Sequence, residues 1–176
     1  RNNMLIGLGF QKRHGKSTVA KRLKRLGYKE LTFATPIKDA VKAVFKVPAM
    51  YTSTRKEVII PSVGKSFRTL CEEFGYCFRS FYGEDFLVAL LEKKLEKLLK
   101  EGKDVVVSDV RHPAEITLIK KYEGHLIRVH NPNCVPDPRF ISETRLLDYV
   151  WPHTIVNDGS MELLDKRIMK TLADLS

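Results

Sequence analysis

Short apolar segments alternate with segments of helical periodicity along most of the chain. The apolar run of residues 4–8 predicts a buried strand, and Val19, Leu23 and Leu26 then recur at the spacing of one helix face. Further strands are predicted over residues 29–34, 105–109, 125–129 and 154–156. Helices are predicted from Pro36, over residues 64–81, 83–100 and 113–122, and after Ser160. This alternation predicts an α/β fold of three layers, with a five-stranded parallel sheet flanked by helices.

Two segments lack a regular pattern, and one helix start is predicted from its cap. Thr35 suits the cap of the helix that begins at Pro36, because a threonine oxygen can accept from a first-turn N–H group. Residues 47–63 are predicted to form a mobile surface loop with room for a short helix. Residues 131–149 carry three prolines and, before Ser142, no apolar period, which predicts a small lid.

The segment from Leu5 to Thr18 reads as a strand, a glycine-bounded loop and a helix start that contains Gly15-Lys16-Ser17. Backbone N–H groups at a helix N-terminus point at an anion, and the helix dipole favours the anion. The segment therefore predicts a phosphate-binding loop. In such a loop Lys16 reaches the terminal phosphates of a nucleotide, and the Ser17 hydroxyl serves Mg²⁺.

Phe10 departs from the usual pattern of such a loop. The pattern has a glycine five residues before Gly15, whereas this chain has Gly9 one residue further back. Either the loop is one residue longer between its glycines, or Phe10 takes an ordinary φ and Gly9 makes the turn.

Three valines, residues 105–107, run into Ser108 and Asp109. This run predicts a central parallel strand with a carboxylate at its carboxyl end. Ligands bind at these ends in open α/β sheets. Asp109 is therefore predicted to hold Mg²⁺, directly or through water, beside Lys16 and Ser17.

Composition excludes some classes of protein. At 176 residues, 43% apolar and 30% charged, the chain fits one soluble globular domain. No apolar run reaches membrane-spanning length and no secretory signal is visible, which predicts a cytoplasmic location and no membrane partner. Cys71, Cys77 and Cys134 have no metal-like spacing and are predicted to be free thiols.

The net charge of +10 is concentrated in the first part of the chain. Residues 1–65 hold 15 Lys and Arg against 3 Asp and Glu, and residues 66–176 hold 16 against 18. The basic part also contains the predicted phosphate loop, which points to a nucleotide or a nucleic acid as ligand. Four cations of the first helix are instead interpreted as a solvated face: Lys21, Arg22, Lys24 and Arg25.

Five segments in chain order resemble the deoxynucleoside monophosphate kinases of tailed bacteriophages, a P-loop nucleoside monophosphate kinase-like family. They are residues 6–23 with the Lys12-Arg13-His14-Gly15-Lys16-Ser17-Thr18 loop, 33–38 (Phe-Ala-Thr-Pro-Ile-Lys), 70–75 with 83–86, 108–115 (Ser-Asp-Val-Arg-His-Pro-Ala-Glu), and 141–143 with 157–160. The resemblance spans nearly the whole chain. It implies a single P-loop kinase domain over residues 1–176, with an acceptor-binding region at residues 36–100 and a lid at residues 131–149.

The chain departs from the family at positions besides Phe10. Thr35 stands where the family usually has Asp, and Ser17 replaces a common Asp. Arg68 and the Cys71-Glu72 pair stand near a usual glutamine and a usual Gly-Thr. The changes at Arg68 and at Cys71-Glu72 put the selectivity for the base in doubt more than the reaction itself.

The resemblance implies that the γ-phosphate of ATP is transferred to a dNMP with Mg²⁺, in the host cytoplasm if the chain is phage-encoded. Residues that would bind ATP are Gly9, Lys12, Arg13, His14, Gly15, Lys16, Ser17 and Thr18. Residues that would serve the acceptor or the transferring phosphate are Lys38, Lys65, Arg68, Arg111 and Glu115. Candidates for transition-state charge, besides Lys16 and Arg111, are Arg128, Arg139 and Arg145. Glu115 and Glu143 either orient arginines or pair at the surface.

Several alternatives stay open at this point. A phosphomevalonate kinase or a dephospho-coenzyme A kinase would fit the loop and Asp109 equally well, although residues 33–38 and 108–115 favour a nucleotide acceptor. A nucleic-acid-binding P-loop protein would use the basic part of the chain, but its cations are not interleaved with aromatic residues. The predicted partners are therefore ATP and a dNMP, with no specific nucleic acid, and a homodimer is left open. The His14 side chain either touches phosphate or points to solvent.

Overall fold

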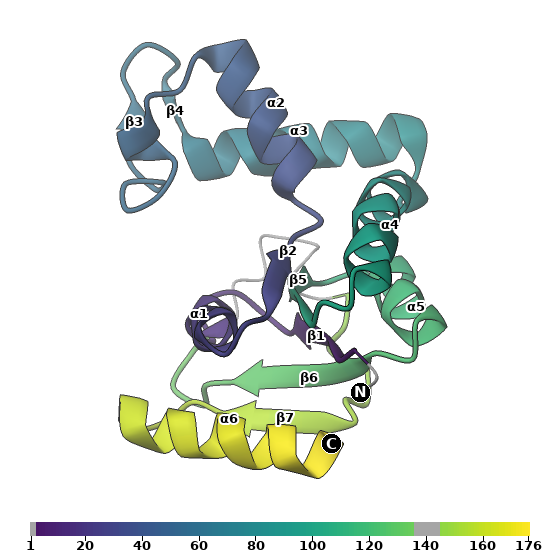
Figure 1. Cartoon of the computed structure of the whole chain (residues 1–176). Coiled ribbons are helices and arrows are strands. Elements are labelled where there is room, and N and C mark those ends of the chain that lie inside the picture. The colour runs from purple at the N-terminus through teal and green to yellow at the C-terminus, as the bar shows by residue number, and fades with distance from the viewer. Residues whose placement is uncertain (1–2, 136–144) are drawn as a thin grey trace. The chain divides into compact units, whose positions relative to one another are not determined.

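A sheet of five parallel strands is the central feature of the computed structural model, which describes residues 3–135 and 145–176 (Figure 1). The strands run in the order β2 (Lys29–Leu31), β5 (Val105–Val110), β1 (Leu5–Gly9), β6 (His125–His130) and β7 (His153–Val156). Each strand is parallel to its neighbours, so all carboxyl ends meet at one edge. The predicted α/β fold with a five-stranded parallel sheet flanked by helices is confirmed.

The chain divides into two compact units. The first, Arg1–Thr32 with Leu90–Ser176, contains this sheet, and the second is Phe33–Ala89. Each unit is described by itself below.

Helices cover both faces of the sheet in the first unit (Figure 1). On one face α1 (Lys16–Arg25) and α6 (Met161–Leu175) share a core with the sheet, to which Ile6 and Leu8 of β1 contribute fully buried side chains. On the other face lies α5 (Pro113–Lys121), where a Cβ on Gly7 would stand 3.0 Å from Ile119. The alternation of a strand thus sends successive residues of β1 to different helices.

The second unit is built on helices and one short hairpin. It contains α2 (Thr35–Phe45), a 3₁₀ turn (Ala49–Tyr51), β3 (Ile59–Ile60), β4 (Lys65–Ser66), α3 (Phe67–Tyr82) and the start of α4 (Asp85–Lys100). Its core residues are Ile37, Val41, Ile60, Phe67, Leu70 and Leu87. The antiparallel pairing of β3 with β4 was not predicted, because each strand has two residues and no periodicity.

Two helix starts in the second unit correct the sequence predictions. The N-cap of α2 is Ala34, which makes no side-chain cap, so the prediction that Thr35 caps this helix is wrong. The helix expected from residue 64 begins at Phe67 because Gly64 has a φ of 73° and residues 65–66 pair with β3. Ser66 caps α3 by accepting from the N–H of Thr69 at 3.2 Å.

Two further observations concern the cysteines and the length of the apolar helices. Among the described residues, all three cysteines are free, as predicted. No helix in residues 3–135 and 145–176 is both long enough and apolar enough to cross a lipid bilayer.

Candidate active site

The predicted phosphate loop lies between β1 and α1, at the carboxyl edge of the sheet. The strand ends at Gly9, the loop occupies residues 10–15, and α1 begins at Lys16. The first N–H groups of a helix have no acceptor within the helix. The first turn of α1 contains no acidic side chain, so an anion would meet no repulsion there.

Lys16 is folded into the loop that precedes it. Its ammonium nitrogen donates to the carbonyl oxygens of Phe10, at 2.6 Å, and of Gln11. The side chain is 6% exposed, so these oxygens take the place of water around a buried charge. The charge of Lys16 is therefore fixed beside the N-terminus of α1.

The backbone of the loop settles the two alternatives left open for Phe10. Phe10 has a φ of 95°, so the interpretation that it takes an ordinary φ is wrong. Gly9 is the last residue of β1, so the turn is made by the residues that follow it and not by Gly9. Arg13 and Gly15 also have positive φ, at 64° and 99°.

Two glycines of the predicted ATP site are required by close contacts. A Cβ on Gly9 would lie 1.8 Å from the indole ring of Trp151. A Cβ on Gly15 would lie 2.2 Å from Nδ2 of Asn157, and that nitrogen donates to the carbonyl of His14 at 3.1 Å. Trp151 and Asn157 thus pack against the two ends of the loop. The sequence did not indicate these contacts, because both partners lie more than a hundred residues away.

His14 does not point to solvent, so that alternative is wrong. The side chain is 1% exposed, and its Nδ1 accepts from the backbone N–H of Asn131 at 2.9 Å. At the neighbouring residue of the loop, the thiol of Cys134 donates to the carbonyl of Arg13 at 3.2 Å. Residues 131–134 therefore hold the middle of the loop.

The predicted metal residues lie on neighbouring elements of the first unit. Gly9 of β1 is in register with Val110 of β5, so Asp109 lies at the same sheet edge as the loop. Asp109 is half-buried, and Ser17 is exposed in the first turn of α1. The described residues contain no group of three or more His, Cys, Asp or Glu side chains that could hold a metal ion. A carboxylate and a hydroxyl are nevertheless donors that fit Mg²⁺ when phosphate oxygens complete its shell.

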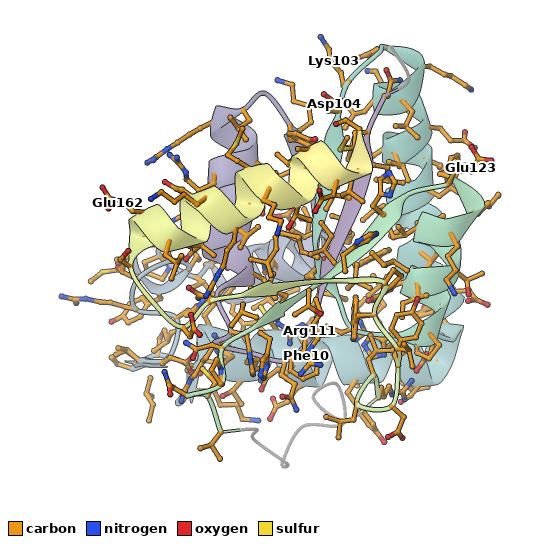
Figure 2. All side chains as sticks on the ribbon, turned by 90° about the horizontal axis from the view of Figure 1, so that it is seen from below. Phe10, Lys103, Asp104, Arg111, Glu123 and Glu162 are labelled. Atoms are coloured by element: carbon orange, nitrogen blue, oxygen red, sulfur yellow. The ribbon has the colours of Figure 1, made fainter. Side chains whose placement is uncertain are left out.

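Arg111 follows the end of β5, and Phe10 follows the end of β1 beside it (Figure 2). The carboxylate of Glu115 accepts from the backbone N–H groups of Arg111 at 2.6 Å and of His112 at 3.0 Å. Glu115 is 3% exposed, so the alternative that it pairs at the surface is wrong. Its observed contacts fix the turn that carries Arg111.

The other predicted acceptor residues belong to the second unit. The ammonium of Lys65 contacts both carboxylate oxygens of Glu73, at 2.7 and 2.8 Å, and Arg68 pairs with Glu57. Lys38 and Arg68 both lie close enough to Cys71 to lower the pKa of its thiol, although burial dominates and raises that pKa to about 11. Lys38 and Arg68 therefore share one neighbourhood, and their role toward a substrate stays a prediction.

The lid prediction falls largely on residues that the structure does not describe. Arg139, Glu143 and the helix predicted from Ser142 lie outside the described residues. Arg145 is described and is exposed in a turn.

Arg128 contacts an aromatic residue of the loop. Its guanidinium lies 4.0 Å from the centre of the Phe10 ring, and a guanidinium nitrogen is 3.2 Å from Nδ1 of His130. Its predicted role toward transition-state charge stays a prediction. The same cluster contains His14, whose ring stacks on that of His130 at 5.5 Å.

The chain is 27% identical to a protein of Acanthamoeba polyphaga mimivirus named "Putative deoxynucleotide monophosphate kinase". The alignment of 189 residues covers 98% of both proteins. The resemblance predicted from the sequence is confirmed. This relative supports a kinase, that is, a phosphotransferase. No protein-family model matches the chain.

Solved structures support the fold. A dephospho-CoA kinase from Campylobacter jejuni superposes with a TM-score of 0.56 at 15% identity, over 99% of this chain and 97% of that one. The TT1252 protein of Thermus thermophilus matches with a TM-score of 0.50 at 17% identity, over the full length of both. At these identities the likeness concerns the P-loop kinase fold and not the substrate.

Proposed function

We propose that this protein transfers the γ-phosphate of ATP to a deoxynucleoside monophosphate, with ADP and a dNDP as products. One observation carries the proposal: the ammonium of Lys16 is fixed at the N-terminus of α1, at the sheet edge where β5 presents Asp109. The full-length similarity to the viral protein supports the choice of a deoxynucleotide as acceptor.

The proposed reaction requires positioning and positive charge more than it requires a base. The attacking group is a phosphate oxygen, which carries its own negative charge and needs no deprotonation. Lys16 would donate to phosphate oxygens of ATP while the carbonyl oxygens of Phe10 and Gln11 hold its ammonium group in place. The charge that develops on the transferred group would then meet an ammonium fixed by the fold.

Mg²⁺, when bound, would neutralise charge on the donor phosphates. Ser17 and Asp109 are the residues we assign to hold it, because their oxygens lie on the loop helix and on the adjacent strand. The backbone N–H groups of residues 12–18 would surround the phosphates of ATP.

Four cations are our candidates for binding the acceptor phosphate. One is Arg111, whose backbone is fixed by Glu115. The others are Lys38, Lys65 and Arg68. Arg139 and Arg145 are proposed to reach the transferring phosphate from the segment at residues 131–149.

An ADP-release assay with a panel of acceptors tests the proposal. ATP is held constant and the four dNMPs, the four NMPs, phosphomevalonate and dephospho-coenzyme A are supplied one at a time. We expect ADP release that depends on at least one dNMP and exceeds that with the corresponding NMP. Turnover only with phosphomevalonate or dephospho-coenzyme A would support a kinase but contradict a dNMP as its acceptor. ADP release that does not depend on any acceptor would contradict both the kinase activity and the acceptor.

A further inference from the structure

Phe10 has a backbone conformation that bulky residues rarely adopt. Its φ of 95° lies in the region that favours glycine, at the position where a phosphate loop usually has one. A bulky residue persists in such a conformation only when its surroundings hold it there.

Three side chains of the first unit pack around the Phe10 ring. The guanidinium of Arg128 lies over its ring, 4.0 Å from the ring centre. The rings of His14 and His130 meet it edge-on, at 4.9 Å and 5.8 Å. A cation over an aromatic face and an edge-to-face ring pair are both attractive geometries. We call these four residues the Phe10 cluster.

The backbone of Phe10 carries the consequence of this packing. Its carbonyl oxygen accepts from the ammonium of Lys16 at 2.6 Å, so the torsions at Phe10 direct one of the two carbonyl groups that hold this lysine. The packing of the ring therefore holds the strained backbone, and the strained backbone in turn directs the carbonyl that contacts Lys16. His14 links the cluster to the loop a second time, because it belongs to the loop and is buried.

We infer that Phe10 is a positioning residue of the phosphate loop, whose clamped ring sets the backbone that holds Lys16 ready for the nucleotide. The inference rests on the proposed function for the role of Lys16, but it makes a separate claim about what fixes Lys16. Phe10 touches no substrate in this account. A glycine at this position would relieve the strain and yet serve the loop less well, because its backbone is free to turn the carbonyl away.

Three variants and one matched control test this inference. Phe10→Gly relieves the strain and removes the ring, whereas Phe10→Tyr keeps the aromatic face. Arg128→Met removes the cation that covers the ring but keeps a long side chain. Glu123→Gly is the control: Glu123 also has a positive φ, of 52°, and is exposed at the end of α5.

Two readouts are measured on each full-length variant. The first is the Kd for ATP by calorimetry. The second is the rate at which Lys16 is acylated by an amine reagent without nucleotide, relative to exposed Lys21, determined by peptide mass spectrometry. The second readout does not depend on catalysis or on ATP.

We expect Phe10→Gly and Arg128→Met to raise the Kd for ATP about tenfold, a change of ~1.4 kcal/mol in binding free energy. Both should also raise the acylation of Lys16, while Phe10→Tyr and Glu123→Gly stay near the wild type. The double variant should be little worse than the worse single variant, because both act through one cluster.

The possible failures are distinguishable. If the wild type binds no ATP, the proposed function fails, and the acylation of Lys16 still decides the role of Phe10. If Phe10→Gly binds ATP as tightly as the wild type and Lys16 stays equally protected, the inference is wrong and the proposed function stands. If Arg128→Met lowers kcat alone, at unchanged Kd and unchanged acylation, Arg128 serves the transition state and the inference is also wrong. If Phe10→Gly does not fold, Arg128→Met gives the same decision.

Discussion

The ammonium nitrogen of Lys16 lies 2.6 Å from the carbonyl oxygen of Phe10, a residue six positions earlier in the chain. This contact fixes a long side chain that would otherwise lose up to ~2 kcal/mol of rotamer entropy on binding a ligand. Much of that ordering has taken place when the protein folds. The loop is thereby preorganised to bind a polyphosphate.

Asp109→Asn should raise the Mg²⁺ concentration needed for half-maximal turnover and lower the maximal rate. The amide keeps the shape of the carboxylate but removes the negative charge that attracts the cation. The measurement is an Mg²⁺ titration of the ADP-release assay, with exposed Asp174→Asn as a matched control. Identical titrations for Asp109→Asn and the wild type would make Asp109 a structural residue.

Glu115→Ala should lower the free energy of unfolding by ~1–3 kcal/mol, because it leaves the N–H groups of Arg111 and His112 without their carboxylate acceptor. It should also raise the KM for the acceptor, since the turn that carries Arg111 is loosened. Glu115→Gln retains an acceptor oxygen and should lose less of both. Denaturant unfolding and acceptor titrations measure the two effects. A destabilised Ala variant with an unchanged KM would separate Glu115 from the acceptor site.

The stability of the protein should fall as the pH is lowered from about 7 to 5, in part through His130. Burial and the nearby charge of Arg128 lower the pKa of His130 below its ordinary value, about 6.5 in an unfolded chain. The unfolded chain therefore binds the proton more readily, so this contribution is complete above the unfolded pKa and is lost as the pH falls toward the folded pKa. His14 from the loop also faces this ring, and stacks on it.

His130→Phe keeps a ring in the cluster and removes its titration. The difference in unfolding free energy between pH 7 and pH 5 should be smaller in this variant than in the wild type. Part of the pH dependence should remain, because burial, together with His153, lowers the pKa of His125 as well. An unchanged difference in His130→Phe would contradict the assignment.

Much of the fold could be predicted because its signals are local. The valine run of β5 and the stripe of Leu87, Leu91 and Leu95 in α4 are readable from spacing alone, and their buried side chains agree with that reading. The hairpin of β3 and β4 could not be read in this way, because two-residue strands have no period. Residue type is a poor guide at the end of α3, where the aromatic residues Phe81 and Tyr82 are 82% and 65% exposed.

In the candidate site, too, local features could be predicted from the sequence and contacts between distant segments could not. Gly15-Lys16-Ser17 is a local motif, and the structure has it in the expected strand–loop–helix context. The contact of Trp151 with Gly9, the bond from Asn157 to His14 and the left-handed φ of Phe10 depend on packing between distant segments. One signal was present in the sequence, namely a phenylalanine where the motif has glycine. The identity of the residue did not reveal its conformation.

Transfer of label from γ-³²P ATP tests the central claim most directly. Enzyme in excess over labelled ATP is mixed with each dNMP, and the products are separated by chromatography, for the wild type, Lys16→Met and exposed Lys21→Met. The account predicts that label appears in a dNDP with the wild type and Lys21→Met. Lys16→Met should be slower by about 10²–10³, because a preorganised charge contact to the transferring phosphate is lost. Label that appears only as inorganic phosphate, or a Lys16→Met variant that forms labelled dNDP at the wild-type rate, would contradict it.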